Sequence, residues 1–102
     1  MDKIEALRKK AIFQAARRAI LENEIFVRDY VTNHLPESYG EKELEDLINM
    51  LVKIFDNDLF DVIMGVKKTE DFEGMYDQRL LKDIENFAVR RREEIKQAKG
   101  LA

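Results

Sequence analysis

Apolar residues recur every three or four positions along most of this chain, and very little interrupts the pattern. The 102 residues include only one proline and four glycines. Alternation of polar and apolar residues, which is typical of half-buried strands, is nearly absent. Spacing of three to four places the apolar side chains on one face of an α-helix. The sequence therefore predicts an all-α fold.

The first half of the chain carries one long apolar run. A helix is expected to begin near Asp2, and the run continues to Leu35 before Pro36 stops it, because proline cannot donate to the helical hydrogen bonds. No residue within the run forces a break. It is compatible with one long helix or with two helices that bend near residues 18–19.

The second half contains three helix signals. Ser38 begins the sequence SYGE, which fits a capping box ahead of the next helix. Either Asp56 or Asn57 is suited to cap a short helix over residues 59–64, and Gly65 is a typical stop after it. Residues 66–74 are predicted to form a polar connection.

The last helix is expected from residue 76 to residue 91, where the 3–4 spacing is clearest. The residues that follow are charged and only weakly apolar. A chain of this length is enough for one small domain. We therefore expect a single helical domain over residues 1–92 and a charged, frayed tail over residues 93–102.

The charges are spread unevenly, although the net charge is only −3. Residues 1–18 hold six bases and two acids, residues 19–89 hold seven bases and 17 acids, and residues 90–102 hold five bases and two acids. An acidic centre disfavours broad nucleic-acid binding, which needs a continuous basic surface. No apolar run approaches the roughly 18 residues of a membrane span. The pattern favours a protein partner, without nucleic acid and without membrane insertion.

Catalytic and metal-binding patterns are not found. The chain has no cysteine and a single histidine, His34, which stands at a predicted helix end. A catalytic triad or a nitrogen-rich metal site therefore cannot be assembled. The acidic cluster around Asp58 fails the EF-hand spacing, because Asp61 stands where that loop requires glycine. We predict no catalytic residue and no metal site.

The segment RRAILENE, residues 17–24, has two interpretations. Arg18 and Glu22 would share one face of a helix and form an ion pair worth roughly 0.2–0.5 kcal/mol. Alanines at positions 15, 16 and 19 make one side of that helix thin. The long charged groups would then be suited to insertion into a polar cleft of a partner.

The order of two motifs resembles that of a known family over about residues 10–91. The family comprises the flavinylation factors of succinate dehydrogenase and fumarate reductase, also called FAD assembly factors. Its RGxxE motif corresponds here to RAILE, residues 18–22, and its D-x-D-L-x-x-W-x-x-G stretch corresponds to DNDLFDVIMG, residues 56–65. Two positions depart from the family: the motif glycine is Ala19, and the tryptophan is Val62. Glycine at the first position would serve either a positive φ or a close approach to the partner.

The resemblance implies a compact bundle of about five short helices and an assembly role. Members are not regarded as enzymes. They bind the flavoprotein subunit of succinate dehydrogenase or fumarate reductase and promote covalent attachment of FAD to a histidine of that subunit. The chain would hold no cofactor tightly and would act on the partner's FAD. It would be a monomer when free, in a bacterial cytoplasm. The residues expected to contact the flavoprotein are Arg17, Arg18, Ala19, Glu22, Glu24, Asp58, Leu59 and Gly65.

Three other functions remain open from the sequence. The main alternative is a small helical regulator that binds another target, as antitoxins do. A second is nucleic-acid binding through the basic residues 8–10 and 90–92, which would show a steep dependence on salt. A third is a metal-free enzyme that uses Arg18 and Glu22.

Overall fold

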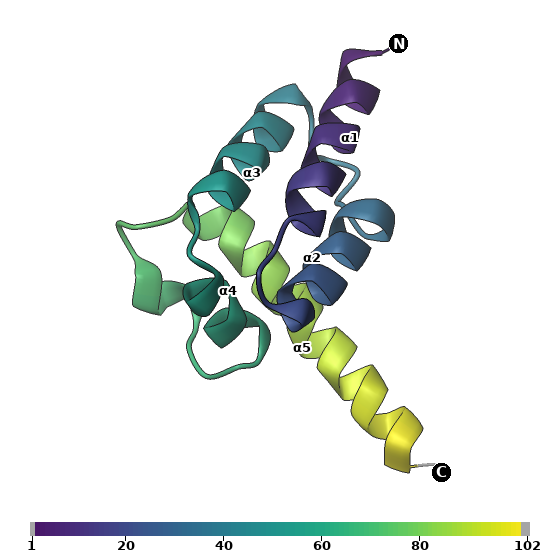
Figure 1. Cartoon of the computed structure of the whole chain (residues 1–102), viewed down its shortest axis with the longest axis vertical. Coiled ribbons are helices and arrows are strands. Elements are labelled where there is room, and N and C mark those ends of the chain that lie inside the picture. Colours follow the sequence, from purple (N-terminus) through teal and green to yellow (C-terminus); the bar gives the residue numbers. More distant parts are fainter. Residues whose placement is uncertain (1, 101–102) are drawn as a thin grey trace.

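Five α-helices and one short 3₁₀-helix account for most of residues 2–100, the part of the chain that the computed structural model describes (Figure 1). Strands are absent from this part, so the all-α prediction is confirmed. The elements are α1 (Lys3–Ala16), α2 (Leu21–Asn33), α3 (Glu41–Lys53), α4 (Asp56–Ile63), η1 (Thr69–Phe72) and α5 (Gln78–Gly100).

The long apolar run of the first half is divided into two helices. Asp2 caps α1, because its Oδ1 accepts a hydrogen bond from the Ile4 N–H at 3.1 Å. α1 ends at Ala16, and residues 17–20 connect it to α2. Of the two possibilities left open by the sequence, the bend near residues 18–19 is confirmed.

Small residues bring α1 close to its neighbours. Ala11 and Ala15 are fully buried and belong to the core. Their short side chains let α1 pack directly on α2 and α3. Of the three alanines that the sequence singled out, Ala15 is buried in this packing, Ala16 is half-buried and Ala19 is exposed.

α3 begins two residues later than the sequence predicted. Gly40 is its N-cap, and the Gly40 N–H donates to Glu43 Oε1 at 2.7 Å. The predicted capping box at residues 38–41 is therefore wrong. The preceding Tyr39 is buried, and its hydroxyl donates to Asp83 on α5. This anchoring of Tyr39 fixes where the chain can enter α3.

The core gathers apolar side chains from all five α-helices. Burial of each large side chain stabilises the fold by about 1.5–3 kcal/mol. Fully buried members include Val27, Leu44, Leu47, Leu51, Leu59, Val62, Ile63 and Leu81.

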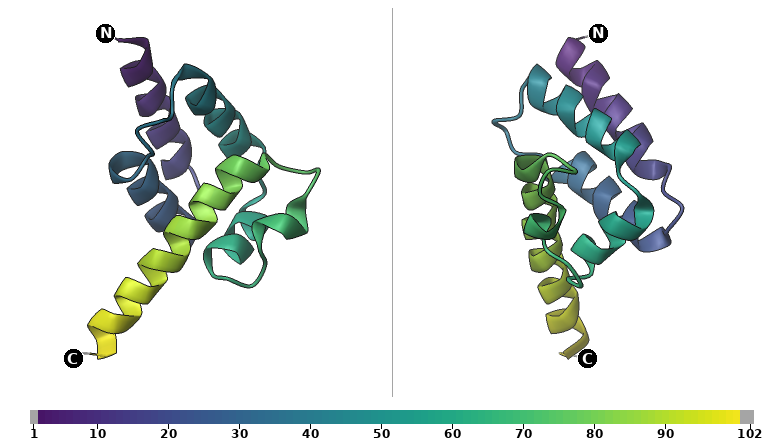
Figure 2. Two further views of the ribbon diagram at one scale, coloured as in Figure 1. Left: turned by 180° about the vertical axis from the view of Figure 1, so that it is seen from behind. Right: turned by 90° about the vertical axis from the view of Figure 1, so that its left-hand side faces the viewer.

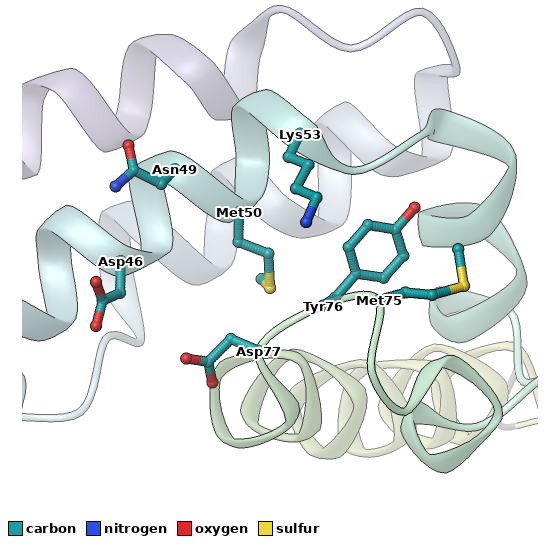
Figure 3. Close-up of a pocket in the computed structure, with 7 residues that line it drawn as sticks. All are labelled: Asp46, Asn49, Met50, Lys53, Met75, Tyr76 and Asp77. Atoms are coloured by element: carbon teal, nitrogen blue, oxygen red, sulfur yellow. The ribbon is translucent and has the colours of Figure 1, made fainter.

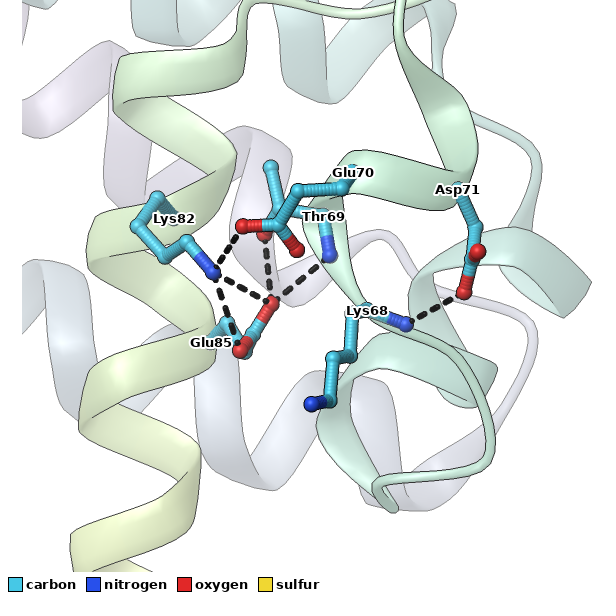
Figure 4. Close-up of polar contacts among 6 residues, drawn as sticks. All are labelled: Lys68, Thr69, Glu70, Asp71, Lys82 and Glu85. Atoms are coloured by element: carbon cyan, nitrogen blue, oxygen red, sulfur yellow. Dashed lines mark hydrogen bonds and ion pairs between the residues drawn. The ribbon is translucent and has the colours of Figure 1, made fainter.

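The predicted polar connection at residues 66–74 is not purely polar. Thr69 and Phe72 are buried within η1. Glu85 of α5 accepts hydrogen bonds from the Thr69 N–H and Oγ1, both at 2.7 Å, and Lys82 lies beside it (Figure 4). Burial opposes ionisation of Glu85, but these hydrogen bonds outweigh it, and the pKa of Glu85 lies below its ordinary value.

α5 is the longest helix, and its last turns extend away from the other helices (Figure 2). Residues 93–100, expected to be a charged tail, are exposed helix, and residues 101–102 lie outside the described part. The Arg92 guanidinium donates to the Ile63 carbonyl at the end of α4. Within residues 2–100, none of the helices combines the length and the apolar character needed to cross a membrane.

Candidate functional site

The two sequence motifs meet at the start of α4. Asp56 is the first residue of this helix, and its carboxylate faces the connection between α1 and α2. Oδ2 accepts a hydrogen bond from the Ala19 N–H at 3.1 Å, and Oδ1 lies 3.5 Å from Nε of Arg18. Residues 37 positions apart are thereby joined. The predicted role of Asp56 or Asn57 as the helix cap is wrong, because Phe55 is the N-cap.

Asn23 completes this arrangement from inside the bundle. It is fully buried, with 0% of its surface exposed. Its Nδ2 donates to the Asp56 backbone carbonyl at 2.8 Å and to Asp56 Oδ1 at 3.2 Å. A buried amide is costly unless it is hydrogen-bonded, so these contacts fix its position. We call Arg18, Ala19, Asn23 and Asp56 the Asp56 clasp.

The predicted ion pair between Arg18 and Glu22 is wrong. Arg18 precedes α2, and its side chain, only 8% exposed, turns toward Asp56. Glu22 lies in the first turn of α2 and is exposed. A pair within one helix is worth a few tenths of a kcal/mol. Each hydrogen bond of the clasp contributes about 0.5–1.5 kcal/mol, so the clasp decides the conformation.

Several charged groups of the RRAILENE segment remain accessible. Arg17 is exposed, and its guanidinium lies 5.2 Å from the centre of the Phe13 ring. Glu22 and Glu24 stand in the first turn of α2, where the helix dipole favours negative charge. Glu24 Oε1 also lies 3.8 Å from Nη1 of Arg28. The segment therefore presents both signs of charge to a partner.

The second motif is partly buried: Leu59, Val62 and Ile63 lie in the core, while Asn57, Met64 and Gly65 are exposed. Asp58 Oδ2 accepts a hydrogen bond from the Tyr76 hydroxyl at 2.6 Å, and burial together with this bond raises the pKa of Tyr76. Leu59 is fully buried. Gly65 has φ of +79°, and a Cβ there would lie 2.9 Å from Arg92 Nη2. These residues shape α4, and of Asp58, Leu59 and Gly65 only Leu59 is buried.

Both departures from the family motif have a structural explanation. Among residues 2–100 only glycines have positive φ, so Ala19 needs no left-handed backbone. This position therefore does not require a positive φ in this chain. Close approach to the partner is the remaining reason for a glycine in the motif. Ala19 is exposed, so its methyl group adds to the surface beside Arg17 and Glu22. Val62 is fully buried and packs in the core.

Three residues of the site were not among those expected to contact a partner. Asp56 appeared only as a motif position and a helix cap, and Asn23 and Tyr76 were not singled out for polar contacts. The second motif begins with two aspartates, Asp56 and Asp58, although a helix needs only one capping side chain. The second aspartate therefore indicated that one of the two makes a different contact. Nothing in the sequence distinguishes the buried Asn23 from an exposed asparagine.

A shallow hollow of about 250 Å³ lies between α3 and the start of α5 (Figure 3). The Tyr76 ring forms one wall, while its hydroxyl points away from Asp46 and Asp77. Asp77 Oδ1 accepts the Leu80 N–H at 3.0 Å, so this carboxylate is engaged at the start of α5. In the described part of the chain, no three His, Asp or Glu residues are grouped to hold a metal ion.

The fold and the site together define a small helical protein that presents a charged segment on its surface and holds it in place by the Asp56 clasp. A family model described as "Flavinator of succinate dehydrogenase" matches residues 9–88, and the chain belongs to this family. The resemblance based on motif order is thus confirmed, and the match covers both motifs. No curated protein and no solved structure matches the chain significantly.

Proposed function

We propose that this protein is an assembly factor that binds the flavoprotein subunit of succinate dehydrogenase or fumarate reductase and promotes covalent attachment of FAD to it. Membership of the succinate dehydrogenase flavinator family supports the role. The observation that carries the proposal is the Asp56 clasp. It holds the family's first motif in one conformation while Arg17, Ala19 and Glu22 remain exposed.

The predicted contact residues divide into two groups. Arg17, Ala19, Glu22 and Glu24 contact the flavoprotein, because the structure leaves them wholly or partly accessible. The remaining four act by shaping that surface. They are Arg18, Asp58, Leu59 and Gly65.

The protein promotes attachment by positioning its partner. The reaction joins a histidine nitrogen of the flavoprotein to a methyl carbon of FAD after that methyl loses a proton. The two electrons pass to the flavin ring, which an electron acceptor then reoxidises, and the flavin supplies this chemistry. Orientation alone accelerates such steps strongly when the reacting groups are held close together. Binding through the RRAILENE segment holds the flavoprotein in the geometry where its histidine and the flavin meet. Glu22 orients polar groups of the flavoprotein and transfers no proton.

Two substitutions at Glu22 test this role. Purified flavoprotein subunit is incubated with FAD and the chain, and covalent flavin is followed with time. Glu22→Gln keeps the size and hydrogen-bonding capacity of the side chain but cannot take up a proton at neutral pH. We expect Glu22→Gln to keep most of the rate and Glu22→Ala to lose most of it. Equal loss in both variants would show that the carboxylate itself, by its charge or by proton transfer, is required, and a chain that does not bind the flavoprotein would contradict the proposed function.

The basic residues 90–92 favour nucleic-acid binding less than their sequence suggested. Arg91 Nη1 lies 3.2 Å from Glu94 Oε2, and Arg91 Nε lies 3.8 Å from Asp29 Oδ2. Arg92 is bonded to the Ile63 carbonyl. Two of the three guanidinium groups thus have partners within the protein, which weakens their attraction for phosphates.

A further inference from the structure

A groove follows the line where the end of α5 passes α2. One hollow in it is lined by Ile25, Phe26, Asp29, Arg91 and Ile95. A second hollow, lined by His34, Phe87, Arg90, Arg91 and Glu94, shares Arg91 with the first. Both of these hollows are lined by residues from the α2 and α5 sides, so they adjoin along the line between the two helices.

The first hollow has apolar walls, and the charged groups at its rim are paired. Ile25 of α2 is 56% exposed, and Ile95 of α5 is 37% exposed. At the rim, Asp29 Oδ1 accepts from Asn33 Nδ2 at 2.8 Å, and Asp29 Oδ2 lies 3.8 Å from Arg91 Nε. Large aliphatic side chains that share a depression and remain exposed are typical of protein interaction surfaces.

The groove is continuous with the RRAILENE segment. Leu21, within that segment, is 63% exposed and stands four residues before Ile25. Residues four apart lie on the same face of a helix. An exposed apolar stripe therefore starts beside Glu22 and runs along α2 into the groove.

The size of protein interfaces requires such an extension. A stable interface buries about 800 Å² and about 20–30 residues on each side. The RRAILENE segment has eight residues, and Arg18 and Asn23 among them are turned inward. This segment alone is too small to hold a flavoprotein subunit. The exposed stripe on α2 is one adjoining surface that can supply apolar area, beside the exposed Phe13 and Phe55.

We propose that the surface that binds the flavoprotein subunit extends along α2 into the groove between α2 and α5. The groove takes an amphipathic segment of the flavoprotein, with one apolar side chain between Ile25 and Ile95 and polar groups toward Asp29 and Arg91. This inference rests on the proposed function and assigns the end of α5 a part in it.

The test measures the affinity of purified flavoprotein subunit for the full chain by calorimetry. The variants are Ile25→Asp and Ile95→Asp, with the milder Ile25→Ala and Ile95→Ala as safeguards against misfolding. Val52→Asp is the matched control, because Val52 on α3 is also β-branched and 61% exposed. We expect at least a tenfold loss of affinity for both aspartate variants, a smaller loss for the alanine variants, no loss for Val52→Asp, and unchanged melting temperatures throughout.

Three results would overturn the proposal. If the groove variants bind like the wild type while Glu22→Ala binds weakly, the extension is wrong and the proposed function stands. If the wild type does not bind the flavoprotein at all, both are wrong. If light scattering shows a dimer that Ile25→Asp dissociates without loss of flavoprotein binding, the groove is an interface between two copies of this chain.

Discussion

At the scale of single residues, Asp56 has the largest effect on the candidate site. Its carboxylate accepts a hydrogen bond from the Ala19 N–H and lies beside the guanidinium of Arg18. Its backbone carbonyl accepts a hydrogen bond from the Asn23 amide. All three come from the family's first motif or the residue next to it. One aspartate in the second motif thus holds the first motif in place, which gives a physical reason for the two motifs to occur together.

Removing the buried amide should weaken the clasp. We expect Asn23→Ala to lower the free energy of unfolding by about 1–3 kcal/mol, because Asp56 loses two hydrogen bonds in a buried place. Urea denaturation measures the change. Asn33→Ala is the control, since Asn33 is exposed and bonds only within one turn of α2. Its expected loss is below about 0.5 kcal/mol. Equal losses in the two variants would contradict the clasp.

Restoring the motif glycine should not stabilise the protein. Ala19 has negative φ, so Ala19→Gly relieves no strain and adds freedom to the unfolded chain. We expect the free energy of unfolding to fall by about 0.4–1 kcal/mol. The affinity for the flavoprotein, measured on the same samples, then reports only the change in surface. A rise in stability would show that alanine is strained at this position.

The sequence located the motif positions correctly but could not determine what they contact. Spacing of four residues predicted a helical pair between Arg18 and Glu22. The actual contact joins Arg18 to Asp56, which lies beyond the intervening helix α3 in the chain. Such pairings depend on tertiary packing and leave no local signal. Asn23 illustrates the same limit, because burial of a single polar residue cannot be read from its neighbours.

At the scale of elements, periodicity predicted the helices better than capping residues predicted their ends. Ser38 is a residue type that commonly caps helices, yet α3 begins at Glu41, because Tyr39 is buried in the core. η1 was missed because its buried Thr69 and Phe72 are separated by charged residues. Gly65 was recognised, and its positive φ explains why it follows α4.

The two glycines with positive φ form a matched pair for mutation. We expect Gly74→Ala to cost about 1–2 kcal/mol of stability from backbone strain alone, because a Cβ there has no atom within 4 Å. Gly65→Ala should cost more, since its Cβ would lie 2.9 Å from Arg92 Nη2 and displace that guanidinium from the Ile63 carbonyl. Chemical denaturation of both variants compares them. A smaller loss at Gly65 would contradict the role assigned to Arg92.

Acid should loosen the attachment of η1 to α5. The pKa of Glu85 is depressed in the folded protein, so its charge stabilises the fold above the unfolded pKa, near 4.3, and this contribution is lost as pH falls through the folded pKa. Denaturation is measured from pH 6 down to about pH 3. We expect Glu85→Gln to be less stable than the wild type at pH 6 and to lose less of its stability on acidification. Parallel curves for the two proteins would show that Glu85 is not responsible.

For the whole molecule, fold class and family followed from the sequence, while the groove beside α2 did not. Periodicity predicted an all-α chain, and the order of two motifs pointed to the family that matches residues 9–88. The shape of the surface beside α2 depends on where α5 leaves the bundle. The apolar spacing of α5 continues through that point unchanged, so the sequence does not mark it. The groove beside α2 therefore became visible only in three dimensions.

We propose above that this chain promotes covalent flavin attachment through the RRAILENE segment. The most direct measurement co-expresses it with the flavoprotein subunit of succinate dehydrogenase, then reads flavin fluorescence in the denatured flavoprotein band on a gel. Samples without the chain, and with Arg17→Ala or Glu22→Ala, are compared with the wild type. We predict fluorescence that requires the chain and falls in both variants, with Val52→Asp as an unaffected control. Equal fluorescence with and without the chain would contradict the assembly role.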